Sequence, residues 1–230
     1  KNSSTMGKIK QGILGGFSGK VGPVIGASWK GKAIMRARAL SVHNPNTDAQ
    51  KHVRAILSLV SKFIGKVSEA VKVGFHGYAV GITEQNAAVK TNIAEAVQGT
   101  GELVSLDWTK VVLSRGSLPN PDTLAAEAIE DEHQVKVSWK GNTGVTREAL
   151  ATDKVHVVLY NSDRKTSLYN STGERAAAGT TKTVTIDHSP DWAGDSVQVF
   201  LFTTSLDGKL TSESVRITDG PFSGFSGVVD

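Results

Sequence analysis

A cluster of glycines near the start of the chain is the first feature that could do chemistry. Four of them lie among lysines: Gly16, Gly19, Gly22 and Gly26. Glycine-rich loops cradle phosphate groups, but such a loop needs a strand before it and a helix after it. Here Pro23 and a segment of β-forming residues follow instead. We therefore expect these glycines to allow close packing of strands, and we predict no cofactor-binding residue.

The histidines are the residues that could hold a metal ion. There are six of them: His43, His52, His76, His133, His156 and His188. No two lie four residues apart, so no single helix face presents a ligand pair. We expect solvated surface histidines and predict no metal site. The acidic run 130–132 could contact Ca²⁺, but we interpret it as a charged loop between strands.

No pattern of nucleophile and base points to a reaction. Cysteine is absent, which excludes disulfides, thiolate nucleophiles and Cys-ligated metal sites. Serine is abundant, yet the Gly-x-Ser-x-Gly turn of many hydrolases does not occur. Paired carboxylates need not be close in sequence, but no stretch points to them. We predict no catalytic residue.

Basic residues near the start of the chain could bind phosphate groups. The first 47 residues contain eight Lys/Arg and no Asp/Glu. The cations that could follow a phosphate backbone are Lys8, Lys10, Lys20, Lys30, Lys32, Arg36 and Arg38. Phe17 and Trp29 could stack on bases. In an extended strand, residues 30, 32, 36 and 38 share parity and could form one basic face.

A basic strand face can also be simply solvated, or it can pair with acidic residues elsewhere. Residues 1–105 carry 14 Lys/Arg and 5 Asp/Glu, whereas residues 106–230 carry 12 and 17. This asymmetry favours either nucleic-acid contact by the basic half or head-to-tail attraction between copies.

The element that carries these cations is a glycine-rich arm over residues 7–42. Short apolar pairs between the glycines predict extended or bulged strands near 12–15, 20–29 and 32–41. Such an arm cannot bury a conventional core by itself. It needs its own body, a neighbouring subunit or a polyanion to lie against.

Helices are predicted after the arm. Thr47 and Gln50 form a capping box, and apolar residues then recur at helical spacing. They predict an amphipathic helix over 47–72 that could break near Gly65. A second helix is predicted from Thr83 to about residue 98.

From residue 102 the apolar pattern changes to a period of two, which is typical of strands. Leu206–Lys209 contains an Asp-Gly pair and predicts a hairpin turn. Strands are expected at 103–108, 110–114, 134–139, 154–160, 166–170, 182–187, 196–203 and 210–217. Short strands at this spacing predict an antiparallel β-sandwich.

Composition is consistent with a soluble globular protein of 230 residues, 39% of them hydrophobic and 21% charged. No apolar run approaches the roughly 18 residues of a membrane span. No secretion signal is visible, and Met6 could be the native start, which would make residues 1–5 foreign.

Two parts of the chain resemble known families. The C-terminal part resembles a fibronectin type III or immunoglobulin-like module, through Trp139, the corner at 191–195 and the hairpin that leads to 212–215. The N-terminal part carries MGKIKQGILGGFSGKVG at 6–22, Trp-Lys-Gly at 29–31 and NPNTDAQ at 44–50. With Gly-Ser-Leu-Pro at 116–119, these segments resemble a family of uncharacterised Bacteroidota proteins.

The Bacteroidota resemblance implies no activity. The Asn-Pro-x-Thr-x-Ala-Gln turn and the helix after it also resemble segments of phage structural proteins. That similarity implies a particle or fibre subunit.

The two ends of the chain share a short glycine-containing sequence motif. Phe17-Ser18-Gly19 recurs as residues 222–224 and again as 225–227. Such segments suit β-addition, in which an extended segment pairs with an open sheet edge of another subunit. Alternatively, both ends pair with the body of their own chain, or the short motifs are similar by chance. The predicted assembly interface is Ile13, Leu14, Phe17, Val21, Val24, Ile25, Trp29, Phe222, Phe225, Val228 and Val229.

Together these patterns predict an α+β protein in three parts. Residues 1–105 would hold the glycine-rich basic arm and two helices, residues 106–219 an antiparallel immunoglobulin-like sandwich, and residues 220–230 a glycine-rich tail. We expect a non-enzymatic structural subunit that forms a filament, fibre or particle surface by strand addition between copies. Its location would be the extracellular surface or a virion, although a cytoplasmic location stays open.

The expected partners are further copies of the chain, or a host-surface or virion protein. One alternative is a module that binds a glycan or protein through sandwich loops near 142–144 and 207–208, in which case Trp192 would be exposed. The other is a nucleic-acid binder that uses the basic arm.

Overall fold

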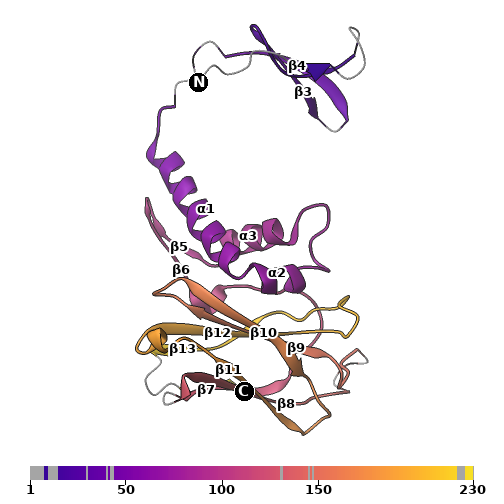
Figure 1. Ribbon diagram of the computed structural model, residues 1–230, viewed down its shortest axis with the longest axis vertical. Coiled ribbons are helices and arrows are strands. Elements are labelled where there is room, and N and C mark those ends of the chain that lie inside the picture. The colour runs from indigo at the N-terminus through magenta and orange to yellow at the C-terminus, as the bar shows by residue number, and fades with distance from the viewer. Residues whose placement is uncertain are drawn as a thin grey trace. The chain divides into compact units, whose positions relative to one another are not determined.

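A computed structural model describes residues 8–9, 15–29, 31–39, 41, 44–129, 132–144, 146, 148–221 and 226–229 (Figure 1). The chain divides into two units, residues 1–46 and residues 47–230. We expected the helices to belong with the arm, up to residue 105. The structure groups them with the sandwich instead, because they bury their apolar side chains against one of its sheets.

The first unit, the arm, is an antiparallel meander of four strands: β1 (Lys8–Ile9), β2 (Phe17–Val21), β3 (Val24–Trp29) and β4 (Lys32–Ala37). The strand expected over 20–29 is divided at Gly22-Pro23. Gly22 has a φ of 56°, a left-handed value that glycine adopts at little cost, so the chain reverses there. Residues 12–14 lie outside the described part of the chain.

The helical layer of the second unit contains α1 (Asp48–Lys66), α2 (Ser68–Gly74) and α3 (Glu84–Glu95). The predicted cap is confirmed, since Thr47 Oγ1 accepts a hydrogen bond from the Gln50 amide at 3.3 Å. The first predicted helix is broken near Gly65, as expected, with the break at Val67. The predicted second helix begins as expected after Thr83.

A hairpin of β5 (Val97–Thr100) and β6 (Leu103–Leu106) follows, and then a single 3-10 turn, η1 (Trp108–Lys110). The strand expected over 110–114 does not form. Its backbone instead bonds to side chains of other segments: the Val112 amide donates to Asn92 Oδ1 at 2.9 Å, and the Leu113 amide to Ser214 Oγ at 2.8 Å.

The sandwich consists of two antiparallel four-stranded sheets. One sheet has the order β10-β9-β12-β13 and the other the order β11-β8-β7-β14. The strands are β7 (Asp122–Ile129), β8 (Gln134–Lys140), β9 (Lys154–Asn161), β10 (Thr166–Glu174), β11 (Thr181–Asp187), β12 (Ser196–Thr204), β13 (Val215–Pro221) and β14 (Ser226–Val229). A second 3-10 turn, η3 (Pro190–Trp192), precedes β12. The α+β class and the antiparallel sandwich are as predicted from the sequence, while β7 was not expected.

The central strands β9 and β12 are buried on both faces, so the second unit has three layers. In β9, Val157 and Leu159 pack against the other sheet, whereas Val158 and Tyr160 pack against the helices. β12 repeats the pattern, with Leu201 facing the other sheet and Phe202 facing the helices. One sheet therefore serves two cores.

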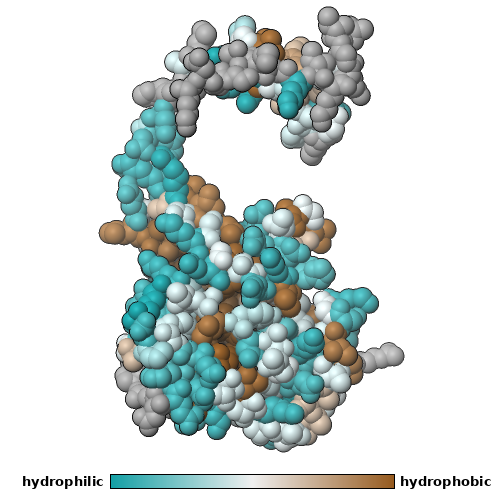
Figure 2. Space-filling model, viewed as in Figure 1, coloured by the Kyte–Doolittle hydropathy of each residue, from teal (hydrophilic) through white to brown (hydrophobic). Residues whose placement is uncertain are grey.

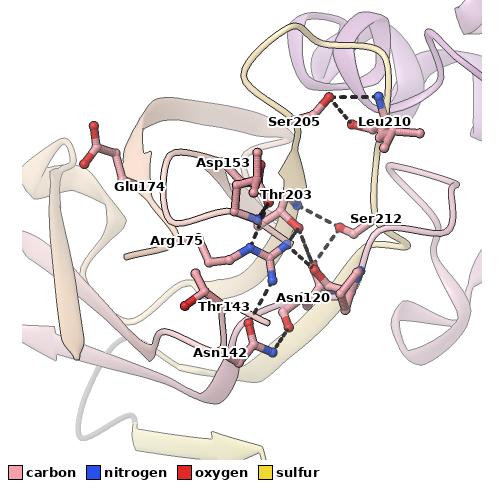
Figure 3. A network of polar contacts seen from close by, with 12 residues as sticks. Asn120, Asn142, Thr143, Asp153, Glu174, Arg175, Thr203, Ser205, Leu210 and Ser212 are labelled. Carbon is pink, nitrogen blue, oxygen red and sulfur yellow. Dashed lines mark hydrogen bonds and ion pairs between the residues drawn. The ribbon is translucent and has the colours of Figure 1, made fainter. Parts of the chain in front are cut away.

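A buried ion pair joins several loops at one end of the sandwich (Figure 3). Arg175 Nε donates to Asp153 Oδ2 at 3.0 Å, and both side chains have 0% exposure. Arg175 Nη1 donates to Asn142 Oδ1 at 2.8 Å. Its Nη2 donates to the Pro119 carbonyl and lies 3.4 Å from Thr203 Oγ1. Burial lowers the pKa of Arg175, and the charge of Asp153 opposes this shift.

Further hydrogen bonds extend this network towards the helices. Asn120 Oδ1 accepts from Ser212 Oγ at 2.6 Å, and Ser212 Oγ accepts from the Thr203 amide at 2.7 Å. Ser114 Oγ donates to the Ser212 carbonyl at 2.6 Å and lies 3.1 Å from the carbonyl of Gly74, the last residue of α2. The network thus connects the helical layer to the sandwich.

We predict that Arg175→Met destabilises the protein by about 3–5 kcal/mol, because it leaves the Asp153 carboxylate buried without its cation. The measurement is the free energy of unfolding in urea. A double variant, Arg175→Met with Asp153→Leu, should recover part of this loss because no unpaired charge remains.

The matched control is Arg164→Met, which removes an exposed pair with Asp195 at 2.6 Å. Exposed pairs contribute little, so its cost should stay within about 1 kcal/mol. Equal costs for Arg175→Met and Arg164→Met would show that the buried pair does not hold the sandwich together.

Candidate assembly interface

The register of the arm places its cations and Trp29 on one face of the sheet. Partners in antiparallel strands point to the same side, as do residues two apart in one strand. Lys20 pairs with Ile25, Ile25 with Arg36, and Trp29 with Lys32, while Lys8 pairs with Ser18. We call the resulting surface the basic face: Lys8, Lys20, Trp29, Lys32 and Arg36. The shared parity of Lys32 and Arg36 is as predicted, and Lys30 lies outside the described residues.

The opposite face of the arm is apolar and thin. Phe17 lies over Gly26, where an added Cβ would collide with the Phe17 ring and carbonyl. Gly26 is the one buried residue among those described in β2, β3 and β4. The glycines here allow close strand packing, as predicted. The segment after them is a hairpin and not a helix, so they form no phosphate loop.

The predicted interface residues divide into three groups. Val21 and Trp29 are exposed at 49% and 62%, and Phe17, Val24 and Ile25 are partly buried. Ile13, Leu14, Phe222 and Phe225 lie outside the described residues. Val228 and Val229 are in β14, where they pair with Ala125 and Leu124 of β7 in the same chain. Of the two arrangements considered for this tail, the structure contains the intramolecular one.

Two exposed apolar residues of the arm were missed by the sequence analysis. Ile34 is 43% exposed and Met35 is 73% exposed, and both lie in β4. The signal was present in the sequence, since Ala33-Ile34-Met35 is an apolar run in a segment without a core. Every residue of β4 is exposed, and no described strand pairs with its outer edge.

The basic residues of β4 restrict what its open edge can pair with. An antiparallel β4–β4 contact centred on Ile34 would put Lys32 of each copy opposite Arg36 of the other. Like charges that lie directly opposite each other are destabilising. Charged side chains on an edge strand also protect it from self-pairing. The edge is thus better suited to an acidic or neutral partner than to another β4.

The described histidines form no metal site. Among the residues that the structure describes, no three His, Asp or Glu side chains converge to hold an ion. His43 and residues 130–131 lie outside this part of the chain. His188 stacks on Trp192 at 5.7 Å, and Trp192 is only 5% exposed. The exposed tryptophan expected of a ligand-binding loop is therefore not found at this position.

His156 is the histidine with the most perturbed environment, and it is 3% exposed. Burial lowers the pKa of His156 to about 4, and the positive charge of Lys154 adds to the effect. Burial also raises the pKa of Tyr169 to about 12, so its hydroxyl keeps its proton. That hydroxyl lies 2.8 Å from His156 Nδ1, and His156 Nε2 lies 2.8 Å from Thr204 Oγ1. We assign Tyr169 as the donor to Nδ1 and Nε2–H as the donor to Thr204.

The fold and the arm together define a two-part α+β protein with a three-layered body and a separate basic sheet. The chain belongs to a family of unknown function, DUF6266, whose model matches residues 16–218. A search of curated proteins finds no match. The chain is similar to a C2 domain of RIM from Drosophila at 13% identity, covering 48% of this chain and 98% of that one, with a TM-score of 0.25. A score this low does not establish a shared fold. Among the described helices, none has the length and apolarity needed to cross a membrane.

We predict that His156 makes stability depend on pH. The unfolded state takes up a proton near pH 6.5, whereas the folded state does so only near pH 4. Stability is therefore complete above pH 6.5 and falls by up to about 3 kcal/mol as the pH drops to 4. Urea unfolding at several pH values measures the effect.

The matched variant is His156→Gln, which keeps hydrogen-bonding groups but does not titrate. The carboxylates contribute equally to both proteins, so the difference between the two curves isolates His156. If the curves run parallel from pH 7 to pH 4, the histidine is not held neutral in the folded state.

Proposed function

We propose that this protein is a non-enzymatic structural subunit that assembles with copies of itself through its arm. The observation that carries the proposal is that the arm is a separate sheet in which Gly26 is the one buried residue among those described in β2, β3 and β4. It exposes Val21, Trp29, Ile34 and Met35, and the outer edge of β4 is paired with no strand that the structure describes. Exposed apolar side chains next to unpaired backbone groups favour strand addition.

Charge supports a head-to-tail contact between copies. Residues 1–46 carry eight Lys/Arg and no Asp/Glu, whereas residues 47–230 carry 18 and 22. The arm of one copy is thus attracted to the body of the next and repelled by the next arm. A heterologous contact of this kind builds rings or filaments.

The sheet edges of the sandwich indicate where an arm could add. The end strands of the two sheets are β10 and β13 in one and β11 and β14 in the other. The pairings of β10 and β13 each contain a shift of register, and β14 is only four residues long. Bulges blunt an edge against further pairing. β11 pairs with β8 over seven consecutive residues without a shift of register. The regular outer edge of β11 is accordingly the acceptor that we favour for β4 of another copy.

A second candidate function is binding of nucleic acid. The basic face favours it, because Lys8, Lys20, Lys32 and Arg36 share one side of a sheet with exposed Trp29. With four phosphate contacts, a plot of the logarithm of the binding constant against the logarithm of the salt concentration would have a slope of about −3 to −4. Binding of this kind requires an added polyanion, whereas assembly by strand pairing requires only copies of the chain.

The setting of the function follows from the same proposal. A self-assembling subunit would act at an extracellular surface or on a virion. The resemblance of residues 6–22 and 44–50 would place it among uncharacterised Bacteroidota proteins. Host-surface or virion proteins would be its further partners.

We predict that the protein with residues 1–46 deleted stays folded and monomeric, because the body keeps both of its cores. Light scattering after gel filtration and negative-stain electron microscopy at low and moderate salt measure the assembly. Full-length protein should form rings or filaments that shorten as salt rises. The same oligomer in the truncated protein would show that the arm is not the assembly element.

A mixing experiment tests the direction of the contact. The truncated body accepts an arm but offers none, so adding it to full-length protein should stop growth and shorten the assemblies. The double variant Lys32→Glu with Arg36→Glu should lose assembly, whereas Lys209→Glu, an 81%-exposed lysine of the body, should not. Full assembly by the arm variant would contradict the electrostatic part of the proposal.

A further inference from the structure

The body contains a cavity that the assembly function does not use. It has a volume of about 410 Å³ and lies between α1, β6, η1 and the end of β9. Its apolar walls are formed by Leu59, Phe63, Val104, Leu106, Trp108 and Tyr160. This volume falls in the range of pockets that enclose small molecules.

Three aromatic rings that contact one another, Phe63, Trp108 and Tyr160, form part of the cavity wall. Phe63 and Tyr160 meet edge to face with centroids 4.9 Å apart, and Phe63 and Trp108 do so at 5.6 Å. Trp108 and Tyr160 lie 5.4 Å apart at an angle of 40°. Each ring is held by the other two, so the apolar surface is formed before any ligand arrives.

Positively charged side chains line the cavity beside these three rings. Lys62, Lys66 and Lys165 line the cavity, and no carboxylate does. Within the described ranges, none of the three lysines forms an ion pair. Lys165 has a φ of 56°, a left-handed conformation that favours glycine or asparagine. Lys165 is therefore one of the few non-glycine residues with a positive φ among those described.

Tyr160 adds a polar group with no partner. The residue is only 5% exposed, and its hydroxyl makes no hydrogen bond with any residue that the structure describes. Burial raises the pKa of Tyr160, so the hydroxyl stays protonated and can donate. This hydroxyl lines the cavity and makes no hydrogen bond within the described part of the protein, so it can donate to an acceptor that a ligand brings.

We propose that this cavity binds a small amphipathic anion, with an apolar body against the three rings and an anionic head group near the lysines and the Tyr160 hydroxyl. Aromatic rings also bind organic cations, but the three lysines would repel them. The arm of another copy is excluded for the same reason, since it carries only positive charges. The neighbouring surface is apolar too: Val53, Leu57 and Leu103 are exposed on α1 and the β5–β6 hairpin, and Figure 2 shows hydrophobic surface over these elements.

The test uses two probes of the same shape with the full-length protein. One is 8-anilinonaphthalene-1-sulfonate, an aromatic anion, and the other is N-phenyl-1-naphthylamine, which lacks the sulfonate. Fluorescence titration should show saturable binding of the anion, displaced by decanoate and not by decanol. Failure of the anion to bind, or equal affinity for both probes, would overturn the proposal.

Variants locate the site. The triple change of Lys62, Lys66 and Lys165 to Ala should weaken binding of the anion about tenfold or more and leave the neutral probe unchanged. A control triple change of Lys72, Lys90 and Lys136 to Ala alters the net charge equally and should have little effect. Tyr160→Phe keeps the ring packing and should weaken binding of the anionic probe about tenfold. Equal affinities in the two triple variants would rule out this cavity, whatever the result for assembly.

Discussion

The buried contact between Arg175 and Asp153 is the interaction on which the rest of the body depends. The guanidinium reaches the loop before β7, the segment after β8, the start of β9 and the end of β12. Asp153 alone neutralises the guanidinium, so loss of its segment would leave a charge unpaired in the interior. Loss of any of the other three segments would remove a hydrogen bond from that charge. Because β9 and β12 each border two cores, fixing their ends fixes the spacing of both.

The body and the arm differ in how much apolar surface they bury. In the body, β12 packs on both of its faces. Its Phe200 and Phe202 pack against the helices, and its Val199 and Leu201 pack against the other sheet. The arm has strands of similar composition, but no second layer is described over them. An isolated sheet of this size gains too little burial to be stable without a partner. This difference is the physical basis of the two proposals, assembly through the arm and ligand binding by the body.

Much of the fold could be predicted from the sequence because the periodic signals were strong. The helix cap at Thr47 and the strands β8 to β12 follow from side-chain pattern alone. The third layer could also have been inferred, since Val158 and Tyr160 in β9 alternate with residues that are equally apolar, as in strands covered on both faces. β7 was missed because its alanines have little preference for strands. Arg175, His156 and the cavity gave no local signal, because their environments are built from segments distant in sequence.

The placement of β14 also concerns how the molecule is made. This strand is synthesised after every other strand of the sandwich, yet its neighbour β7 is the first of them. The outer edge of β7 therefore stays open throughout synthesis of the sandwich and closes only when β14 arrives. Contacts between such distant segments form slowly, and an unpaired edge is most prone to wrong pairing while it waits. If the arm adds to sheet edges as proposed, late closure leaves a period in which the arm of another copy can pair with β7 before β14 does.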